Sequence, residues 1–451
     1  MCMATATNAK EGDYVADEVG KSIRDYVDLI HERLGFSGVV LAGPDGSVVA
    51  AIPRGSEDHE GTESLKYTTL FEIASCTKMF TAVAVLQLAE SGKLSLDDSI
   101  ANHLPDVPGN CKAITIRHLL SHTSGIPGTN TTGAGDDIKK VIPTFLSGGP
   151  RHPPGTHYEY WNQGYALLSE IIARTSGQSY SQYIRDNIFA RCKMSASRFT
   201  GDNVPNGASV SVGESSRGEA RSALEHPYGS YGLQYRGMGG LVTNVQDLWK
   251  WDRAMKSNQL INARLVQEMT TPGRGGYGLG CSITKDPTGN DSHQHSGSVR
   301  GFLADVRRYP SIDGAVFILS NSDQSLPFEV IGAGVEQILF GNKPNTEIPG
   351  TLNTETINGI AGKYVDAKGR RLVIEEATGL STIKIYWGGP VTTGVVGLNK
   401  SGTPCLFMTK PKNGALTFNI DSELEFLPSK GKAASVSLLG LTPKLTFIRT
   451  D

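Results

Sequence analysis

The sequence predicts an α+β protein, in which an antiparallel sheet flanked by helices carries a helical lobe and is followed by a small all-β barrel domain. Three observations support this fold class. A helix and two strands open the first part of the chain, and two strands and a helix close it. The segment between them, from Phe71 to Leu260, has mainly helical periodicity. After a polar stretch, helical periodicity stops and short β-rich runs follow one another.

The predicted sheet is built from both ends of the large unit. Apolar residues recur at three- and four-residue steps from Val15 to Leu34, which indicates an amphipathic helix. Two β-branched runs follow, and Pro44-Asp45-Gly46 between them is typical of a hairpin. These runs are Ser37–Ala42 and Ser47–Ile52, and the closing elements are expected over Phe302–Tyr309, Gly314–Ser320 and Phe328–Phe340.

The predicted domain boundaries follow a change in composition. We expect a catalytic domain over 1–342, a linker over 343–358 that is polar and contains proline, and a β-barrel domain over 359–451. Turn residues separate the short β-rich runs of this last segment. The runs are Arg371–Glu375, Thr382–Trp387, Cys405–Met408, Leu416–Ile420, Leu424–Leu427, Ser435–Leu439 and Leu445–Ile448.

Composition excludes several classes of function. The 451 residues include 43 Lys and Arg against 45 Asp and Glu, so the chain lacks the basic excess of a nucleic-acid-binding protein. We find no apolar leader and no stretch long enough to span a membrane. The six cysteines are scattered without a CxxC pair, and His293 and His295 have no cluster of cysteines or carboxylates near them. We therefore expect a cytoplasmic protein with no cofactor and no metal.

The first motif with chemical meaning is Ser75-Cys76-Thr77-Lys78, at the start of a long apolar helical stretch. Ser75 and Lys78 are three residues apart, so both side chains face the same way in the first turn. The partial positive charge of a helix N-terminus favours a neutral lysine, which can act as a base toward the serine hydroxyl. An N-cap serine beside an incidental surface lysine is the simpler interpretation of this motif on its own.

Two further motifs carry polar groups suited to the same chemistry. Tyr160 and Asn162 are two residues apart in an aromatic-rich turn, where a phenol can relay a proton and an amide can bind a carbonyl. His295-Ser296-Gly297 comes just before the strand expected at Phe302. Gly297 permits close approach to the backbone, and the next N–H could point into a site. Packing roles for Tyr160 and His295 remain open when each motif is taken alone.

The order and spacing of the three motifs resemble the serine β-lactamase and penicillin-binding-protein superfamily. The similarity is to the branch that holds class C β-lactamases, D-aminopeptidases, DD-peptidases and related esterases, and it covers about Val15 to Leu339. The tail resembles the lipocalin-like domain found in many members. Supporting similar stretches are Ile114–Pro127, Gly237–Trp251 and Gly276–Gly280.

This resemblance implies a role for each motif residue. Ser75 would be the acylated nucleophile, with Lys78 and Tyr160 sharing the general base and acid roles, in an order that the sequence leaves open. Asn162 would hold Lys78 and the substrate amide. His295 would line the site opposite Tyr160, beside Ser296 and Gly297, and would help to orient Tyr160 or a substrate carboxylate. The N–H groups of Ser75 and Ser298 would form the oxyanion hole.

His295 departs from the lysine found in β-lactamases of this class. A neutral imidazole binds a substrate carboxylate less well than an ammonium, which shifts the expectation toward a peptidase, amidase or esterase. Trp387-Gly388-Gly389 is an alternative third motif, which we interpret as a strand end and a turn. We interpret Cys76 as a packed small residue.

The hypothesis that follows is a serine hydrolase that cleaves amide or ester bonds through an acyl-enzyme on Ser75. An acyltransferase using the same acyl-enzyme and a weak β-lactamase are the alternatives, and a non-catalytic binding protein is a third. The expected partner is a small-molecule or short-peptide substrate, with no nucleic acid and no membrane, and the chain could form a homo-oligomer.

Overall fold

The computed structural model describes residues 12–58, 60–128, 136–204, 206–215, 218–229, 231–346, 348–350, 354–375, 381–386, 391–398, 404–412, 415–429, 432–439 and 445–450. The chain divides into two compact units. The first consists of Met1–Arg24 and Ser37–Ser325, and the second of Asp25–Phe36 and Leu326–Asp451. The proposed alternative motif at Trp387 to Gly389 lies outside the described residues.

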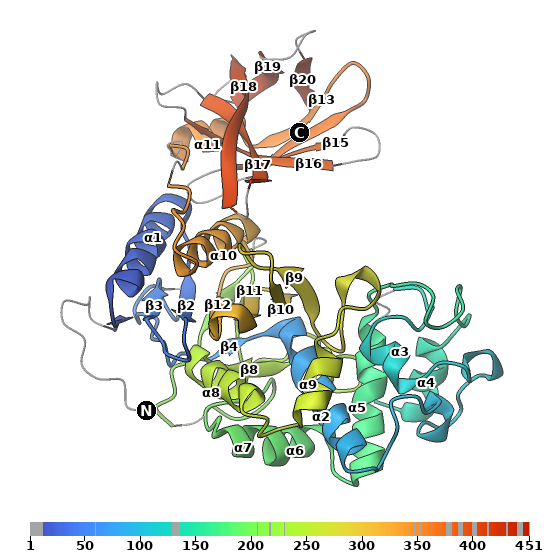
Figure 1. Ribbon diagram of the computed structural model, residues 1–451. Coiled ribbons are helices and arrows are strands. Elements are labelled where there is room, and N and C mark those ends of the chain that lie inside the picture. The colour runs from blue at the N-terminus through green and yellow to red at the C-terminus, as the bar shows by residue number, and fades with distance from the viewer. Residues whose placement is uncertain are drawn as a thin grey trace. The chain divides into compact units, whose positions relative to one another are not determined.

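The first unit contains an antiparallel sheet that combines strands from near its N-terminal end with strands from near its C-terminal end (Figure 1). Seven strands of the described part form it in the order β1-β3-β2-β12-β11-β10-β9. The opening hairpin and the closing pair join through β2 and β12, where Leu41 lies opposite Phe317. This arrangement confirms the predicted sheet. The strands are Tyr14–Val15, Ala50–Arg54, Gly38–Gly43, Gly314–Ser320, Phe302–Tyr309, Asp291–Val299 and Ser282–Lys285.

Helix α2 (Thr77–Glu90) lies at the centre of the first unit. Every residue from Thr77 to Leu88 is buried, as predicted for a helix that is apolar on all sides. It packs against α5 (Asn162–Ser176) and α6 (Tyr180–Ile184). The other helices of this unit are α3 (Ile116–Leu120), α4 (Ile138–Phe145), α7 (Ala190–Cys192), α8 (Val245–Lys256) and α9 (Ala263–Met269).

The structure corrects several predicted elements. Val15 belongs to β1, so α1 (Glu18–Leu34) begins one turn later than the apolar period suggested. His295, Ser296 and Gly297, which were expected just before the strand at Phe302, lie within a strand of their own, β10. Eight of its nine residues are polar or glycine, so it lacks the alternating apolar pattern by which strands are recognised in a sequence. The mainly helical middle also holds a three-stranded sheet, β4-β8-β5 (Phe71–Glu72, Leu241–Thr243 and Arg198–Phe199).

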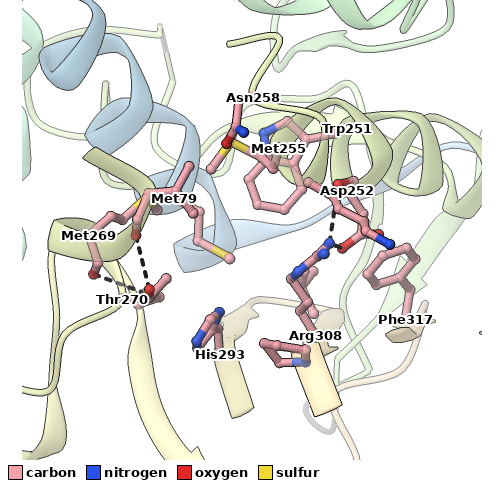
Figure 2. A pocket seen from close by; sticks show the side chains of 15 residues that line it. Met79, Trp251, Asp252, Met255, Asn258, Met269, Thr270, His293, Arg308 and Phe317 are labelled. Carbon is pink, nitrogen blue, oxygen red and sulfur yellow. Dashed lines mark hydrogen bonds and ion pairs between the residues drawn. The ribbon is translucent and has the colours of Figure 1, made fainter. Parts of the chain in front are cut away.

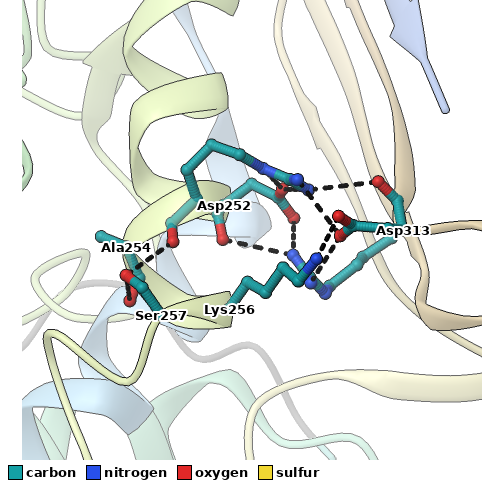
Figure 3. A network of polar contacts seen from close by, with 7 residues as sticks. Asp252, Ala254, Lys256, Ser257 and Asp313 are labelled. Atoms are coloured by element: carbon teal, nitrogen blue, oxygen red, sulfur yellow. Dashed lines mark hydrogen bonds and ion pairs between the residues drawn. The ribbon is translucent and has the colours of Figure 1, made fainter. Parts of the chain in front are cut away.

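A network of charged side chains joins α8 to the turn between β11 and β12 (Figure 3). Asp252 is 1% exposed and accepts from Arg253 Nε at 2.8 Å and from Arg308 Nη1. Asp313 pairs with Arg253 Nη1 at 3.1 Å and with Lys256. Arg308 Nη2 also lies 3.7 Å from Asp313, so each carboxylate pairs with at least two cations, and the network links the helix to the sheet.

The second unit contains α10 (Ser325–Leu339), α11 (Thr354–Ile360) and a closed antiparallel barrel. Tyr26 Oη of α1 donates to the Val330 carbonyl of α10 at 3.2 Å. In the described part, β13 pairs with β20 and closes the barrel, which confirms the predicted all-β domain. Its strands are Gly362–Val365, Arg371–Glu375, Ser381–Tyr386, Val391–Leu398, Pro404–Lys412, Ala415–Ser429, Lys432–Leu438 and Leu445–Arg449, β13 to β20.

Two details of the barrel differ from the prediction. The runs Leu416–Ile420 and Leu424–Leu427 belong to one long strand, β18. Strands β13 and β16 were missed, because β13 is only four residues long, with glycine and lysine in it, and two glycines interrupt β16. Buried side chains from seven of the eight strands, including Tyr364, Leu406 and Phe447, form the described core of the barrel.

Candidate active site

Ser75 lies in a tight turn, Ala74–Cys76, between β4 and α2. The preceding residue, Ala74, has a φ of 44°, a backbone conformation that a residue with a Cβ seldom adopts. Leu241 of strand β8 forms hydrogen bonds with the residues before and after this turn. Ile73 N donates to Leu241 O at 3.0 Å, and Leu241 N donates to Thr77 Oγ1 at 3.2 Å. Strained backbone held in this way is typical of functional sites.

Lys78 is completely buried, and its amine lies beside the serine. Nζ is 3.1 Å from Ser75 Oγ and donates to the Met238 carbonyl at 3.1 Å. Among the described residues, no carboxylate forms an ion pair with it. Burial therefore lowers the pKa of the Lys78 ammonium to about 7, against the smaller opposing effect of Cys76. A large fraction of this amine is neutral near pH 7 and can accept a proton.

Tyr160 completes the group around the serine oxygen. Its ring centroid is 4.9 Å from Lys78 Nζ, and its hydroxyl forms a hydrogen bond with Ser75. Burial raises the pKa of the Tyr160 phenol above its ordinary value, and the hydrogen bond with Ser75 opposes this only in part. Tyr160 is therefore a neutral phenol at pH 7, able to donate and to accept one hydrogen bond.

His295 lies close to this group, but its polar partners are elsewhere. Nδ1 is 2.6 Å from the Ser296 carbonyl oxygen, and Nε2 is 3.0 Å from Tyr277 Oη. Since a carbonyl can only accept, the proton is on Nδ1 and Nε2 accepts from Tyr277. Burial, and then the charge of Lys78, lowers the pKa of His295 to about 3, so the imidazole is neutral. Its ring centroid is 6.3 Å from that of Tyr160.

Gly297 allows strand β10 to lie directly against the nucleophile turn. A Cβ at this position would be 2.2 Å from Ile73 O and 3.1 Å from Ser75 N. The glycine thus serves the approach of two backbone segments, where the sequence suggested approach of a substrate. Ser296 and Ser298 alternate with the buried residues of β10 and are exposed. The oxyanion role of the Ser298 N–H stays a prediction.

Cys76 joins the turn to the same strand. Its thiol is fully buried and donates to the His295 carbonyl at 3.0 Å. Burial raises the pKa of this thiol well above its ordinary value, so it is a poor nucleophile. Asn162 is the first residue of helix α5, whereas the sequence predicted that it lies in an aromatic-rich turn. It is half-buried and lies two residues after Tyr160.

The sequence interpretation missed several aromatic residues that surround the group. Tyr277 binds His295, and the Tyr165 ring centroid is 5.6 Å from Lys78 Nζ. The ring of His122 packs on Tyr160, Tyr165 and Tyr277, with centroids 4.3, 5.1 and 4.9 Å away. His122 and Tyr277 lie in Ile114–Pro127 and Gly276–Gly280, two stretches that resemble the superfamily. Their aromatic rings in these stretches could have identified them as site residues from the sequence.

A cavity of about 210 Å³ lies apart from this group, next to α2, α8 and α9 (Figure 2). Neither Ser75, Lys78, Tyr160 nor His295 lines it. Mainly apolar side chains surround it, including Met79, Trp251, Met255 and Met269, with His293 and Arg308 at one side. Within the described ranges, we find no cluster of three metal-ligating side chains and no helix long and apolar enough to cross a bilayer.

The sheet, the helices and the appended barrel define a β-lactamase-like α+β fold. The chain matches the Beta-lactamase family over residues 23–337 and belongs to that family. It is 27% identical to penicillin-binding protein 4* of Bacillus subtilis over 377 residues, covering 76% of this chain and 83% of that protein. It is 32% identical to the putative penicillin-binding protein PbpX of the same organism over 278 residues, covering 60% and 67%.

Solved structures share the fold. The octameric penicillin-binding protein homologue from Pyrococcus abyssi has a TM-score of 0.65 and 24% identity, covering 96% of this chain and 100% of that chain. This match extends over both units of the present fold. The D-amino acid amidase from Ochrobactrum anthropi SV3, complexed with L-phenylalanine amide, has a TM-score of 0.60 and 22% identity, covering 72% and 98%.

Proposed function

We propose that this protein is a serine hydrolase that cleaves amide or ester bonds through a covalent acyl-enzyme on Ser75. One observation carries the proposal: a buried amine, without a carboxylate partner in the described chain, lies 3.1 Å from the serine hydroxyl oxygen. Membership of the Beta-lactamase family supports it.

We assign the first proton transfer to Lys78. Its pKa is lowered to about 7, so the neutral amine can take the proton of Ser75 as the oxygen attacks the substrate carbonyl. Tyr160, whose pKa is raised, acts as a neutral relay that passes the proton to the leaving amine or alcohol. Water then attacks the acyl-enzyme, and the same groups return the proton to Ser75. The N–H groups of Ser75 and Ser298 stabilise the oxyanion.

The neutral state of His295 indicates the class of substrate. Tyr277 and the Ser296 carbonyl occupy both of its ring nitrogens, and its pKa is about 3, so it offers no positive charge to a carboxylate. We therefore propose substrates without a carboxylate next to the scissile bond, such as amino-acid amides, aminopeptidase substrates or neutral esters. The amidase structure noted above is a precedent for the first of these.

A substrate panel with Ser75→Ala tests the function. The panel contains D- and L-amino-acid amides, p-nitrophenyl esters and nitrocefin, and we expect amides or esters to be turned over at least about 10³-fold more slowly by the variant. Ser91→Ala, at the other end of the segment that contains α2, is the matched control and should keep full activity. Full activity of Ser75→Ala would refute the proposal.

The same panel distinguishes the alternatives. With an added alcohol or amine, formation of the transfer product in place of the acid would indicate an acyltransferase. Fast nitrocefin turnover would indicate a β-lactamase and contradict the proposed substrate class. A homo-oligomer, for which the octameric relative is a precedent, and the cytoplasmic setting remain proposals.

A further inference from the structure

His122 accepts hydrogen bonds from the backbone N–H groups of both residues next to Tyr160. The backbone N–H of Trp161 donates to His122 Nδ1 at 3.1 Å, and the N–H of Glu159 donates to the His122 carbonyl at 2.9 Å. One residue on the α3 side of the site thus fixes the backbone immediately before and immediately after Tyr160. No other residue of the described chain is seen to bind both of these N–H groups.

His122 itself is held in a demanding conformation. Its φ is 55°, in the left-handed region that residues with a Cβ seldom adopt, and its side chain is 2% exposed. The next residue, Thr123, accepts from Gly155 N at 2.7 Å, which ties the same segment to the chain leading to Tyr160. A buried residue adopts such a strained backbone conformation only where the surrounding structure imposes it, and residues of this kind are common at functional sites.

The ring of His122 also contacts the phenol directly. Its centroid is 4.3 Å from that of Tyr160 and 4.9 Å from that of Tyr277, which is the partner of His295. Because Nδ1 accepts from Trp161, the imidazole is neutral with its proton on Nε2, and burial lowers the pKa of His122 well below its ordinary value. Nε2 is buried without a hydrogen-bond partner among the described residues.

We propose that His122 is a positioning residue that holds the Tyr160 hydroxyl at Ser75. It acts through its hydrogen bonds with the N–H groups of Glu159 and Trp161 and through ring packing, and it does not touch the reacting atoms. The inference rests on the proposed function, in which Tyr160 relays the proton. Displacement of a relay group by about 1 Å can cost on the order of 10²-fold in rate, so firm placement matters to kcat.

The test uses three variants of the full chain. His122→Phe keeps a ring and removes the acceptor, His122→Asn keeps an acceptor and removes the ring, and His118→Asn alters only the cap of α3. We expect His122→Phe to lower kcat by about 10- to 100-fold with little change in KM. His122→Asn should recover part of the loss, and His118→Asn should change the melting temperature but not kcat.

The decisive step repeats His122→Phe in a Tyr160→Phe background. If His122 acts through the Tyr160 hydroxyl, the second substitution should lower kcat by less than about threefold there, because coupled residues are not additive. An equal loss in both backgrounds, a change in KM alone, or no loss would overturn the inference. So would failure of both His122 variants to fold, which would assign the residue to stability alone.

These outcomes are separate from failure of the proposed function. If Ser75→Ala is inactive while the His122 variants are fully active, only the positioning role is wrong. If Ser75→Ala is fully active, the proposed function itself is wrong.

Discussion

Two regions of the first unit handle buried charge in opposite ways. In the network of α8 and the β11–β12 turn, the buried Asp252 is met by two arginines, and each cation has a carboxylate partner (Figure 3). At the nucleophile turn, Lys78 is fully buried, its amine donates to the Ser75 hydroxyl and the Met238 carbonyl, and no carboxylate of the described residues pairs with it. The same chain thus pairs its charges in one place and leaves one unpaired in another.

The difference separates stability from reactivity. A paired, buried charge keeps its proton state and links two elements. An unpaired, buried ammonium loses part of its charge, and the pKa of about 7 makes Lys78 a base at neutral pH at some cost to the free energy of folding. Substitutions at Lys78 and in the charged network, with activity and stability measured for each, test this difference.

The largest effect is expected from Lys78→Met. Removal of the base should lower kcat/KM by about 10³-fold or more. The same variant should be as stable as the wild type or more stable at pH 7, because an unpaired buried cation is replaced by an apolar side chain. Kinetics and thermal unfolding of one preparation measure both. A variant that loses stability and keeps its activity would reverse the assignment.

The pH dependence of stability follows from the same group. The ordinary lysine pKa of 10.5 applies to the unfolded chain and about 7 to the folded one, so between these values the unfolded state binds more protons. The free energy of unfolding should therefore rise with pH across this window, by roughly 3 to 5 kcal/mol in total. Urea titrations at several pH values should show this slope in the wild type, and a slope of the same size in Lys78→Met would rule out the lysine as its source.

Asp252→Asn should have the opposite pattern to Lys78→Met. Asp252 is 1% exposed, and its loss leaves Arg253 and Arg308 without their main partner. We expect the free energy of unfolding to fall by about 3 kcal/mol, with kcat/KM of the folded protein unchanged. Denaturant titration and active-site-normalised kinetics provide the check, and a large loss of kcat/KM would connect the network to catalysis.

Tyr277→Phe should lower the free energy of unfolding by less than Asp252→Asn and by more than Asp313→Asn. It removes the donor to His295 Nε2, which is buried and would be left without that partner. Leaving such a group unpaired costs about 1 to 3 kcal/mol of stability. Tyr14→Phe, on edge strand β1, is a control at a partly buried position. Equal effects of the two substitutions on thermal unfolding would argue against the assigned hydrogen bond.

Asp313→Asn should have the smallest effect. The carboxylate is 26% exposed, so its pairs with Arg253 and Lys256 are partly screened, and we expect about 1 kcal/mol that shrinks at high salt. Burial raises the pKa of Asp313, but the hydrogen bond from Lys256 and the neighbouring cations lower it below its usual 3.8 overall. Its contribution is present above pH 3.8 and is lost as the pH falls through the lower folded pKa. Unfolding curves recorded against salt and pH measure it.

Sequence patterns predicted the sheet and α2 because apolar periodicity reports burial, as at Leu41 and Phe317, which face each other across β2 and β12. Strand β10 was missed because its serines and histidines lack that periodicity. The role of Gly297 depends on Ile73, with which a Cβ at position 297 would clash. The role of His122 depends on its two hydrogen bonds with the residues next to Tyr160. Both contacts join segments that are far apart in the chain, so no local sequence pattern predicts them.

The most direct test of the account is the pH dependence of Ser75 acylation. A neutral fluorophosphonate is added to the full chain at pH values from 5 to 9, and intact mass with peptide mapping follows the label on Ser75. We expect the rate to rise with pH as Lys78 loses its proton and to level off above an apparent pKa of about 7. A rate that does not change with pH, or a label that forms at the same rate in Lys78→Met, would contradict the claim that a buried neutral lysine activates this serine.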